Sequence, residues 1–159
     1  MKNIVAIIPA RMGSSRFPGK PMTKILGKPM IGWVYENVSN CEQLTETVVA
    51  TCDKEIYDYI SKLGGKAIMT APDHKRASDR CGEALKILEQ EKNIIFDIVV
   101  MVQGDEPMTN AQMINESISA LLLEEDVLVS NLLGTIDSVE EFEDRNCIKV
   151  VCDINNNAI

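Results

Sequence analysis

A polar segment near the start of the chain, residues 9–20, has the composition of a phosphate-binding loop. It follows an apolar run over residues 4–8 and is rich in arginine, serine and glycine. Phosphate groups are bound by backbone N–H groups that small residues expose and by the charges of arginine and lysine. Arg11, Arg16 and Lys20 supply those charges. The segment therefore predicts a phosphate site, with a basic surface loop as the alternative.

The spacing in this segment differs from that of two common nucleotide-binding motifs. Its small residues, which would let a phosphate approach the backbone, are Gly13, Ser14, Ser15 and Gly19. In the Walker motif the lysine is followed by serine or threonine at the start of a long helix, and that pattern is not present here. The glycine triplet of the Rossmann motif is also missing. We therefore expect a nucleotide-binding loop of another kind.

A second segment with chemical potential is Gln103-Gly104-Asp105-Glu106-Pro107, which directly follows the apolar run 97–102. Mg²⁺ commonly takes one or two carboxylates and leaves its other positions to substrate phosphate and water. The alternative is a capped turn in which Asp105 accepts backbone N–H groups. Because the phosphate loop is expected at the same edge of the sheet, we favour Asp105 as a Mg²⁺ ligand.

A third polar segment, residues 70–80, offers hydrogen-bonding groups without a Ser-His-Asp arrangement. His74 is the single histidine of the chain, and we expect it to be a structural hydrogen-bonding residue rather than a catalyst. Arg80 falls on the first turn of a predicted helix, where it can reach a phosphate or pair with Asp79 or Glu83 at the surface. Both interpretations of Arg80 stay open.

Alternating strands and helices must position these three segments. Strands are expected over 4–8, 47–51, 66–70, 97–102, 127–132 and 148–152, with 97–102 in the centre of the sheet. Helices are expected from Pro29 to Val38, over 54–63, over 79–90, from Asn110, and over 138–142. The helix over 54–63 has Asp53 as cap and Tyr57 and Leu63 facing inward, and the helix from Asn110 carries Met113 and Leu122. This order predicts βαβ units and a mainly parallel sheet in a three-layer α/β/α fold. Ligands of such sheets bind outside the carboxyl ends of the strands, where the polar segments lie.

The bulk composition excludes several classes of protein. The 159 residues suffice for one domain, and the net charge of −8 argues against nucleic acid or an anionic membrane as partner. No apolar run is long enough to span a bilayer, and the start lacks the pattern of a secretory signal. The five cysteines contain no CxxC pair and indicate reduced thiols in the cytoplasm, with a zinc site at Cys147 and Cys152 disfavoured. Because a new strand begins shortly before Ile159, we expect domain 1–159 to be an incomplete part of a longer protein.

Together these segments resemble the sugar-acid cytidylyltransferases, in particular the 3-deoxy-manno-octulosonate cytidylyltransferase (CMP-KDO synthetase) family. The resemblance runs in matching order through nearly the whole chain. It is carried by Ile8-Pro9-Ala10-Arg11 with the following Ser14, Arg16 and Pro18-Gly19-Lys20-Pro21, by Gly27-Lys28-Pro29-Met30, by Thr70 with Asp73-His74, by 102–107, and by 146–153. It implies a nucleotide-diphospho-sugar transferase-like fold and transfer of CMP from CTP to a sugar acid such as 3-deoxy-manno-octulosonate. Pyrophosphate would be released, in a step that activates a lipopolysaccharide precursor.

The resemblance also implies roles for individual residues. Arg11, Lys20 and Asp105 would be catalytic, with the two cations on the triphosphate and Asp105 on Mg²⁺. The remaining nucleotide-binding positions would be Pro9, Ala10, Ser14, Ser15, Arg16, Thr70, Asp73, His74, Ser78, Arg80 and Gln103. The whole protein would be a cytoplasmic enzyme that binds CTP and a sugar acid, and a homodimer at full length.

Two departures from the family pattern leave other functions open. The family commonly shows Ser-Gly-Thr where this chain has Arg76-Ala77-Ser78, which bears on the choice of nucleotide. The family's second metal-binding aspartate and its sugar-binding residues lie further along than Ile159. The alternatives are another sugar nucleotidyltransferase of the same fold, or a nucleotide-binding fragment without a complete active site.

Overall fold

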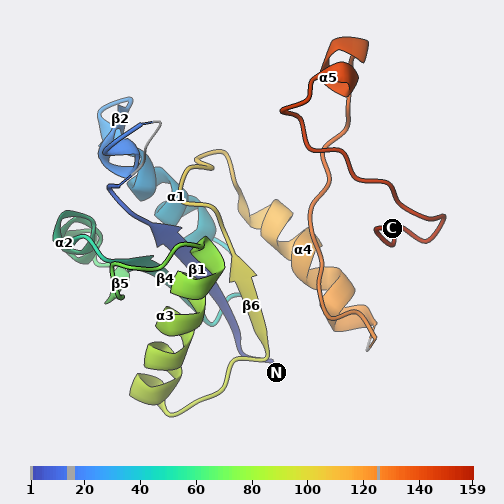
Figure 1. Cartoon of the computed structure of the whole chain (residues 1–159). Helices are drawn as coiled ribbons and strands as arrows, with labels where there is room; N and C mark the ends of the chain where they lie inside the picture. Colours follow the sequence, from blue (N-terminus) through green and yellow to red (C-terminus); the bar gives the residue numbers. More distant parts are fainter. Residues whose placement is uncertain (1, 14–16, 125) are drawn as a thin grey trace.

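A four-stranded parallel sheet in the order β5-β4-β1-β6 forms the centre of the fold (Figure 1). Its strands are β1 (Ile4–Ala10), β4 (Glu46–Thr51), β5 (Lys66–Met69) and β6 (Ile98–Met101). Two short strands, β2 (Lys24–Ile25) and β3 (Lys28–Pro29), form a separate antiparallel hairpin. The structure is a computed structural model that describes residues 2–13, 17–124 and 126–159.

Helices cover both faces of the sheet, which confirms the α/β class and the parallel arrangement predicted from the sequence. The helices are α1 (Met30–Ser39), α2 (Lys54–Lys62), α3 (Ala77–Lys92), α4 (Ala111–Leu123), α5 (Val139–Glu143) and the 3₁₀ turn η1 (Lys20–Met22). Helices α1, α2 and α4 contribute to one buried cluster and α3 to the other. Across the described ranges, no helix combines the length and the apolar character needed to cross a membrane.

Strand β1 joins the two hydrophobic clusters because its side chains alternate between the faces of the sheet. Ile4, Ala6 and Ile8 pack with α1, α2 and α4, whereas Val5 and Ile7 pack with α3. Side chains from Val5 to Ile8 are 0% exposed. A strand buried on both faces reads as a continuous apolar run, which is why the sequence located it well.

The predicted central place of 97–102 is wrong. Strand β6 is outermost in the sheet of described residues, and Val99 and Met101 are 40% and 45% exposed. The centre belongs to β1 and β4, which have hydrogen-bonded neighbours on both sides. An apolar run is typical of a strand in the sheet but does not distinguish its edge from its middle.

Two further predicted strands, 127–132 and 148–152, are also wrong. The segment after α4 turns back alongside that helix before it reaches α5 (Figure 1). It has no strand among its described residues beyond a single bridge between Cys152 and Ala158. Leu128 and Ile148 are 86% and 89% exposed. Apolar, β-branched sequence favours a strand only where a neighbouring strand accepts its hydrogen bonds.

The predicted helices are present, with corrections to individual side chains. Asp53 lies at the N-cap of α2 as expected, but its side chain does not cap that helix. Tyr57 and Leu63, expected inward, are 36% and 41% exposed. On α4, Met113 and Leu122 are 40% and 43% exposed. Asn110 starts this helix as expected and caps it, because its Oδ1 accepts the N–H of Met113 at 3.0 Å.

Candidate functional site

A pocket of about 330 Å³ opens at the carboxyl ends of the strands, where the ligand site is predicted. It gathers residues from the loops after β1, β5 and β6. The lining consists of Pro9, Ala10, Arg11, Gly13, Lys20, Pro21, Met30, His74, Lys75, Arg76, Ala77, Arg80, Gln103, Gly104 and Asp105. Segments that are separated by about 90 positions in the sequence therefore meet at one site.

An ion pair links the loop after β1 to the turn after β6. The ammonium of Lys20 lies 2.6 Å from Oδ2 of Asp105, and the two side chains are 39% and 46% exposed. Half-exposed pairs of this kind contribute only about 0–1 kcal/mol to stability, so the pair can exchange for other partners at little cost. The structure thus places the predicted phosphate-binding lysine beside the predicted metal-binding carboxylate.

The loop after β1 is fixed to the sheet at its two described ends. Gly19 has a φ of +73°, a conformation that glycine adopts without steric cost, and its N–H donates to the carbonyl of Met12 at 2.9 Å. The N–H of Met12 donates in turn to Oδ2 of Asp53 at 2.8 Å. The side chain of Asp53 therefore holds this loop rather than capping α2. The predicted nucleotide-binding residues Ser14, Ser15 and Arg16 lie outside the described residues.

The turn that carries Asp105 packs closely against β1. A Cβ atom at Gly104 would lie 2.7 Å from the carbonyl oxygen of Pro9, a distance that real Cβ atoms do not adopt. The turn closes through the N–H of Glu106, which donates to the carbonyl of Gln103 at 3.2 Å. Glycine at 104 thus sets how near the carboxylate of Asp105 comes to the loop after β1.

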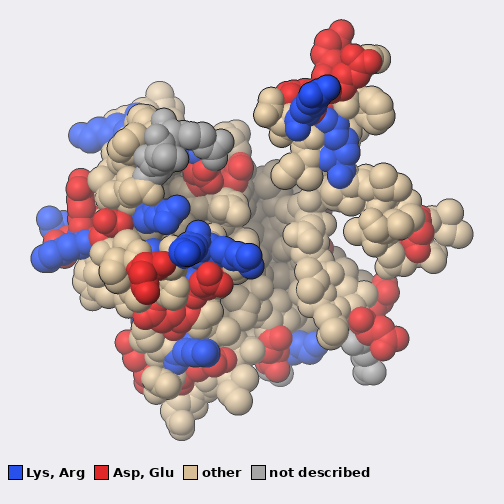
Figure 2. Space-filling view, in the orientation of Figure 1, with Lys and Arg blue, Asp and Glu red and all other residues tan. Residues whose placement is uncertain are grey.

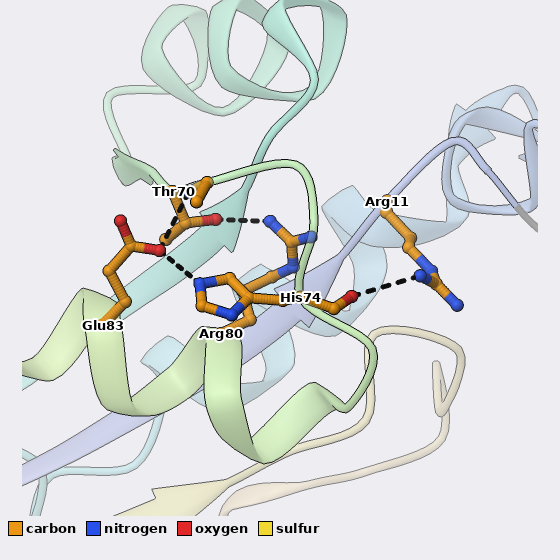
Figure 3. A network of polar contacts seen from close by, with 6 residues as sticks. Arg11, Thr70, His74, Arg80 and Glu83 are labelled. Atoms are coloured by element: carbon orange, nitrogen blue, oxygen red, sulfur yellow. Dashed lines mark hydrogen bonds and ion pairs between the residues drawn. The ribbon is translucent and has the colours of Figure 1, made fainter.

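Arg80 is the most deeply buried charged residue of the pocket lining, at 3% exposure. Its Nη1 donates to the hydroxyl of Thr70, as Figure 3 shows. Its Nη2 is buried and has no hydrogen-bond partner among the described residues. Of the two placements considered for Arg80, the surface ion pair is therefore wrong. A buried donor without an acceptor costs free energy until a ligand supplies one.

His74 directs its ring away from the pocket centre and towards α3 (Figure 3). Its Nε2 pairs with Oε2 of Glu83, the oxygen that also accepts the N–H of Ala71 at 2.9 Å. The main-chain carbonyl of His74 accepts from Nη1 of Arg11 at 3.5 Å. His74 is thus a hydrogen-bonding residue of the loop, as the sequence predicts, and also part of the pocket wall.

The pocket brings together most of the predicted site residues that the structure describes. Those in its lining are Pro9, Ala10, Arg11, Lys20, His74, Arg80, Gln103 and Asp105. Thr70 lies behind the lining as the partner of Arg80. Asp73 and Ser78 are exposed and fall outside the lining. Lys75 lines the pocket without having been predicted, and Glu83 holds the His74 loop from outside the lining, a role that no pattern in the sequence indicates.

The lining is strongly cationic in a chain whose net charge is −8. It contains the side chains of Arg11, Lys20, Lys75, Arg76 and Arg80 against the single carboxylate of Asp105. Figure 2 shows lysine and arginine side chains gathered at the centre of this face, over the upper end of α3 in the orientation of Figure 1. Such a local reversal of charge attracts an anionic ligand.

The described residues suit a magnesium ion only in company with a ligand. They contain no group of three or more histidine, cysteine or acidic side chains that could hold a metal ion by themselves. The carboxylate of Asp105 is half exposed and lines the pocket. One carboxylate plus ligand phosphates and waters is a usual set for Mg²⁺. Asp105 therefore fits the ion as one ligand of several.

Known proteins are similar to this one in sequence and in fold. A 3-deoxy-manno-octulosonate cytidylyltransferase of Trichlorobacter lovleyi is 42% identical over 98% of this chain and 60% of its own length. One of Syntrophus aciditrophicus is 43% identical over 100% of this chain and 63% of its own. The chain thus spans about 60% of the length of these curated relatives.

A solved structure of CMP:2-keto-3-deoxy-manno-octonic acid synthetase complexed with CTP is also similar. It matches with a TM-score of 0.87 and 35% identity, over 99% of this chain and 63% of that one. A nucleotidyl transferase of Methanothermobacter thermautotroptrophicus, at 17% identity and a TM-score of 0.60, shares the fold. The model of the family described as "Cytidylyltransferase" matches residues 5–159. This chain therefore belongs to the cytidylyltransferase family.

Proposed function

We propose that the protein transfers CMP from CTP to a sugar acid such as 3-deoxy-manno-octulosonate and releases pyrophosphate. The observation that carries the proposal is the meeting of Lys20 and Asp105 in a cationic pocket at the carboxyl edge of the sheet. The names of the relatives and of the solved CTP complex support the choice of nucleotide and acceptor.

The roles of the charged residues follow from the chemistry of this transfer. Attack on the α-phosphorus of CTP needs in-line positioning and neutralisation of the charge on the phosphate oxygens and the leaving pyrophosphate. Arg11 and Lys20 would bind the triphosphate, and Asp105 would hold Mg²⁺, which supplies further neutralisation when bound. In this arrangement the Lys20–Asp105 pair opens, and each side chain exchanges its partner for a group of the substrate.

The buried guanidinium of Arg80 is suited to the base of the nucleotide. Its Nη1 is held by Thr70, and the buried Nη2 has no hydrogen-bond partner among the described residues, so a ligand acceptor could satisfy it. The cytosine ring presents a carbonyl oxygen and a ring nitrogen that accept hydrogen bonds, whereas Arg80 has only donors. Pro9, Ala10 and His74 would form the walls of the base and ribose site, with Gln103 on the nucleotide or sugar.

The setting of the whole protein is part of this proposal. Its five cysteines are free, in keeping with an enzyme of the reducing cytoplasm. We infer that the whole protein binds the sugar acid and forms a homodimer. The proposed transfer would activate a lipopolysaccharide precursor, the step that the family resemblance implies.

A nucleotide screen followed by a turnover assay tests the proposal. Thermal shifts are measured with Mg²⁺ and CTP, UTP, GTP or ATP, since a ligand at about 100 times its Kd stabilises by roughly 2.7 kcal/mol. We expect CTP to give the largest shift. Equal shifts with UTP or ATP would favour another nucleotidyltransferase of this fold, a possibility to which Arg76, lining the pocket, gives weight.

Pyrophosphate release from CTP and 3-deoxy-manno-octulosonate then measures the transfer itself. CTP binding without release would identify the 159-residue chain as a nucleotide-binding unit that lacks the rest of the active site. The absence of a shift with every nucleotide would contradict the proposed function altogether.

A further inference from the structure

One carboxylate outside the pocket lining fastens the loop between β5 and α3. Oε2 of Glu83 accepts the N–H of Ala71 at 2.9 Å and also pairs with Nε2 of His74 (Figure 3). A single oxygen therefore joins the helix to both ends of the segment from Ala71 to His74. This is a clamp between α3 and the loop, and the roles assigned above do not explain it.

The loop held by this clamp sets two guanidinium groups of the pocket. Thr70, directly before Ala71, accepts from Nη1 of Arg80, and the carbonyl of His74 accepts from Nη1 of Arg11. The bond to Arg11 is 3.5 Å long, at the outer limit for a hydrogen bond, so the loop orients this guanidinium only weakly. The clamp thus holds the loop that accepts hydrogen bonds from the guanidinium groups of Arg80 and Arg11.

The charge of Glu83 strengthens the clamp. The hydrogen bond from His74 lowers the pKa of this carboxyl, and the backbone N–H of Ala71 and the nearby charge of Arg80 lower it further. Glu83 is therefore ionised at neutral pH. An ionised acceptor makes hydrogen bonds about twice as strong as a neutral one.

We propose that Glu83 is a positioning residue for nucleotide binding, which holds the 70–76 loop so that Arg11 and Arg80 are set for the triphosphate and the base. This role rests on the proposed function. The side chain touches neither the pocket nor, in this arrangement, the nucleotide. It acts by keeping the 70–76 loop in its binding geometry before the nucleotide arrives. Less conformational freedom of the loop is then lost on binding.

The test compares three variants by calorimetric titration with CTP and Mg²⁺. We expect Glu83→Ala to raise the Kd for CTP about tenfold or more, the loss that follows when a hydrogen bond to a charged group is removed. Glu83→Gln should recover part of the affinity, since its amide oxygen can accept from both donors.

Glu89→Ala is the matched control on the same helix. Oε1 of Glu89 accepts the N–H of Phe96 at 3.0 Å, at the end of α3 away from the pocket. We expect it to lower the unfolding midpoint as Glu83→Ala does, while the Kd for CTP stays unchanged. Equal losses of affinity in Glu83→Ala and Glu89→Ala would show a merely structural role.

Amide exchange supplies a readout that needs no nucleotide. The Ala71 amide should exchange faster in Glu83→Ala than in the unaltered chain, and Glu89→Ala should leave it slow. Unchanged Ala71 exchange, or a Kd within twofold of the unaltered value in Glu83→Ala, would overturn the role of Glu83 alone. Failure of the unaltered chain to bind CTP would instead overturn the proposed function and this role with it.

Discussion

The ammonium of Lys20 and the carboxylate of Asp105 lie 2.6 Å apart, although 85 positions separate them in the chain. The pair joins the loop after β1 to the turn after β6, the two segments to which sequence patterns assign phosphate and metal binding. Each side chain is the other's ion-pair partner. In the proposed function, nucleotide binding replaces this contact, and the effect of that exchange on CTP affinity can be measured.

Replacing Asp105 with asparagine should separate metal-dependent from metal-independent binding. Without Mg²⁺, we expect CTP to bind Asp105→Asn at least as well as the unaltered chain, because the substitution removes a negative charge near the phosphates and releases Lys20. With Mg²⁺, the unaltered chain should gain about tenfold or more in affinity and the variant should gain nothing. Titrations with and without the metal measure both effects.

Asp58→Asn on α2 is the control for loss of an exposed ion pair. Asp58 pairs with Lys54 at 2.7 Å, away from the pocket. Both variants should lower the free energy of unfolding by no more than about 1 kcal/mol. A Mg²⁺ gain that survives in Asp105→Asn would remove Asp105 from the metal site.

Arg80→Met should preserve stability while abolishing nucleotide binding. In the unaltered chain a buried donor without a partner costs about 1–3 kcal/mol, and methionine removes that donor. We therefore expect the free energy of unfolding in urea to be equal or higher in the variant, with no thermal shift on adding CTP. Thr70→Val should have the opposite effect on stability, since it deprives Nη1 of its acceptor as well. A strongly destabilised Arg80→Met would show that the guanidinium is structural.

Which residues meet at the pocket could be predicted from the sequence better than the hydrogen bonds between them. Arg11, Lys20 and Asp105 stand out because they lie in polar segments that follow apolar runs, and such segments mark the carboxyl ends of strands, where loops converge. Glu83 does not stand out, because its importance depends on how the 70–76 loop folds back on α3. The local sequence predicts Asp53 as a helix cap. Its side chain instead accepts the backbone N–H of Met12, 41 positions away.

The errors in the fold have a related cause. Local pattern places β1 and β4 correctly because both are buried on both faces. It wrongly predicts strands over 127–132 and 148–152. An apolar run becomes a strand only where a partner strand is available, and its own residues do not reveal that. The edge position of β6 is likewise a property of the sheet as a whole.

Gly104→Ala should disturb both folding and metal-dependent binding. The added methyl would meet the carbonyl oxygen of Pro9 at 2.7 Å, so the turn carrying Asp105 must move away from β1. We expect a loss of about 1–3 kcal/mol in the free energy of unfolding, as for other overpacked sites, and a weaker gain in CTP affinity with Mg²⁺. Urea unfolding and titration measure the two effects.

Gly82→Ala is the opposite case within the same chain. Gly82 lies inside α3, and a Cβ there meets nothing within 4 Å. Alanine should raise the free energy of unfolding by about 0.5–1 kcal/mol through its higher helix propensity, with CTP binding unchanged. If Gly104→Ala behaved like Gly82→Ala, the close approach of the turn to β1 would be refuted.

Cys81 should make the stability of the fold depend on pH in the alkaline range. Burial of this thiol between α3 and the sheet raises its pKa from 9.0 to about 11, and the nearby Arg80 opposes this only in part. The folded protein therefore retains the thiol proton at a pH where the unfolded chain has lost it. The stabilising contribution is complete below pH 9.0 and is lost as the pH rises towards about 11. Unfolding in urea at a series of pH values measures how the free energy of unfolding declines. Cys81→Ala should be less stable throughout but should show a shallower decline with pH. The other alkaline groups titrate equally in both proteins, so the difference reports on Cys81. Identical slopes would contradict the buried, protonated state of Cys81.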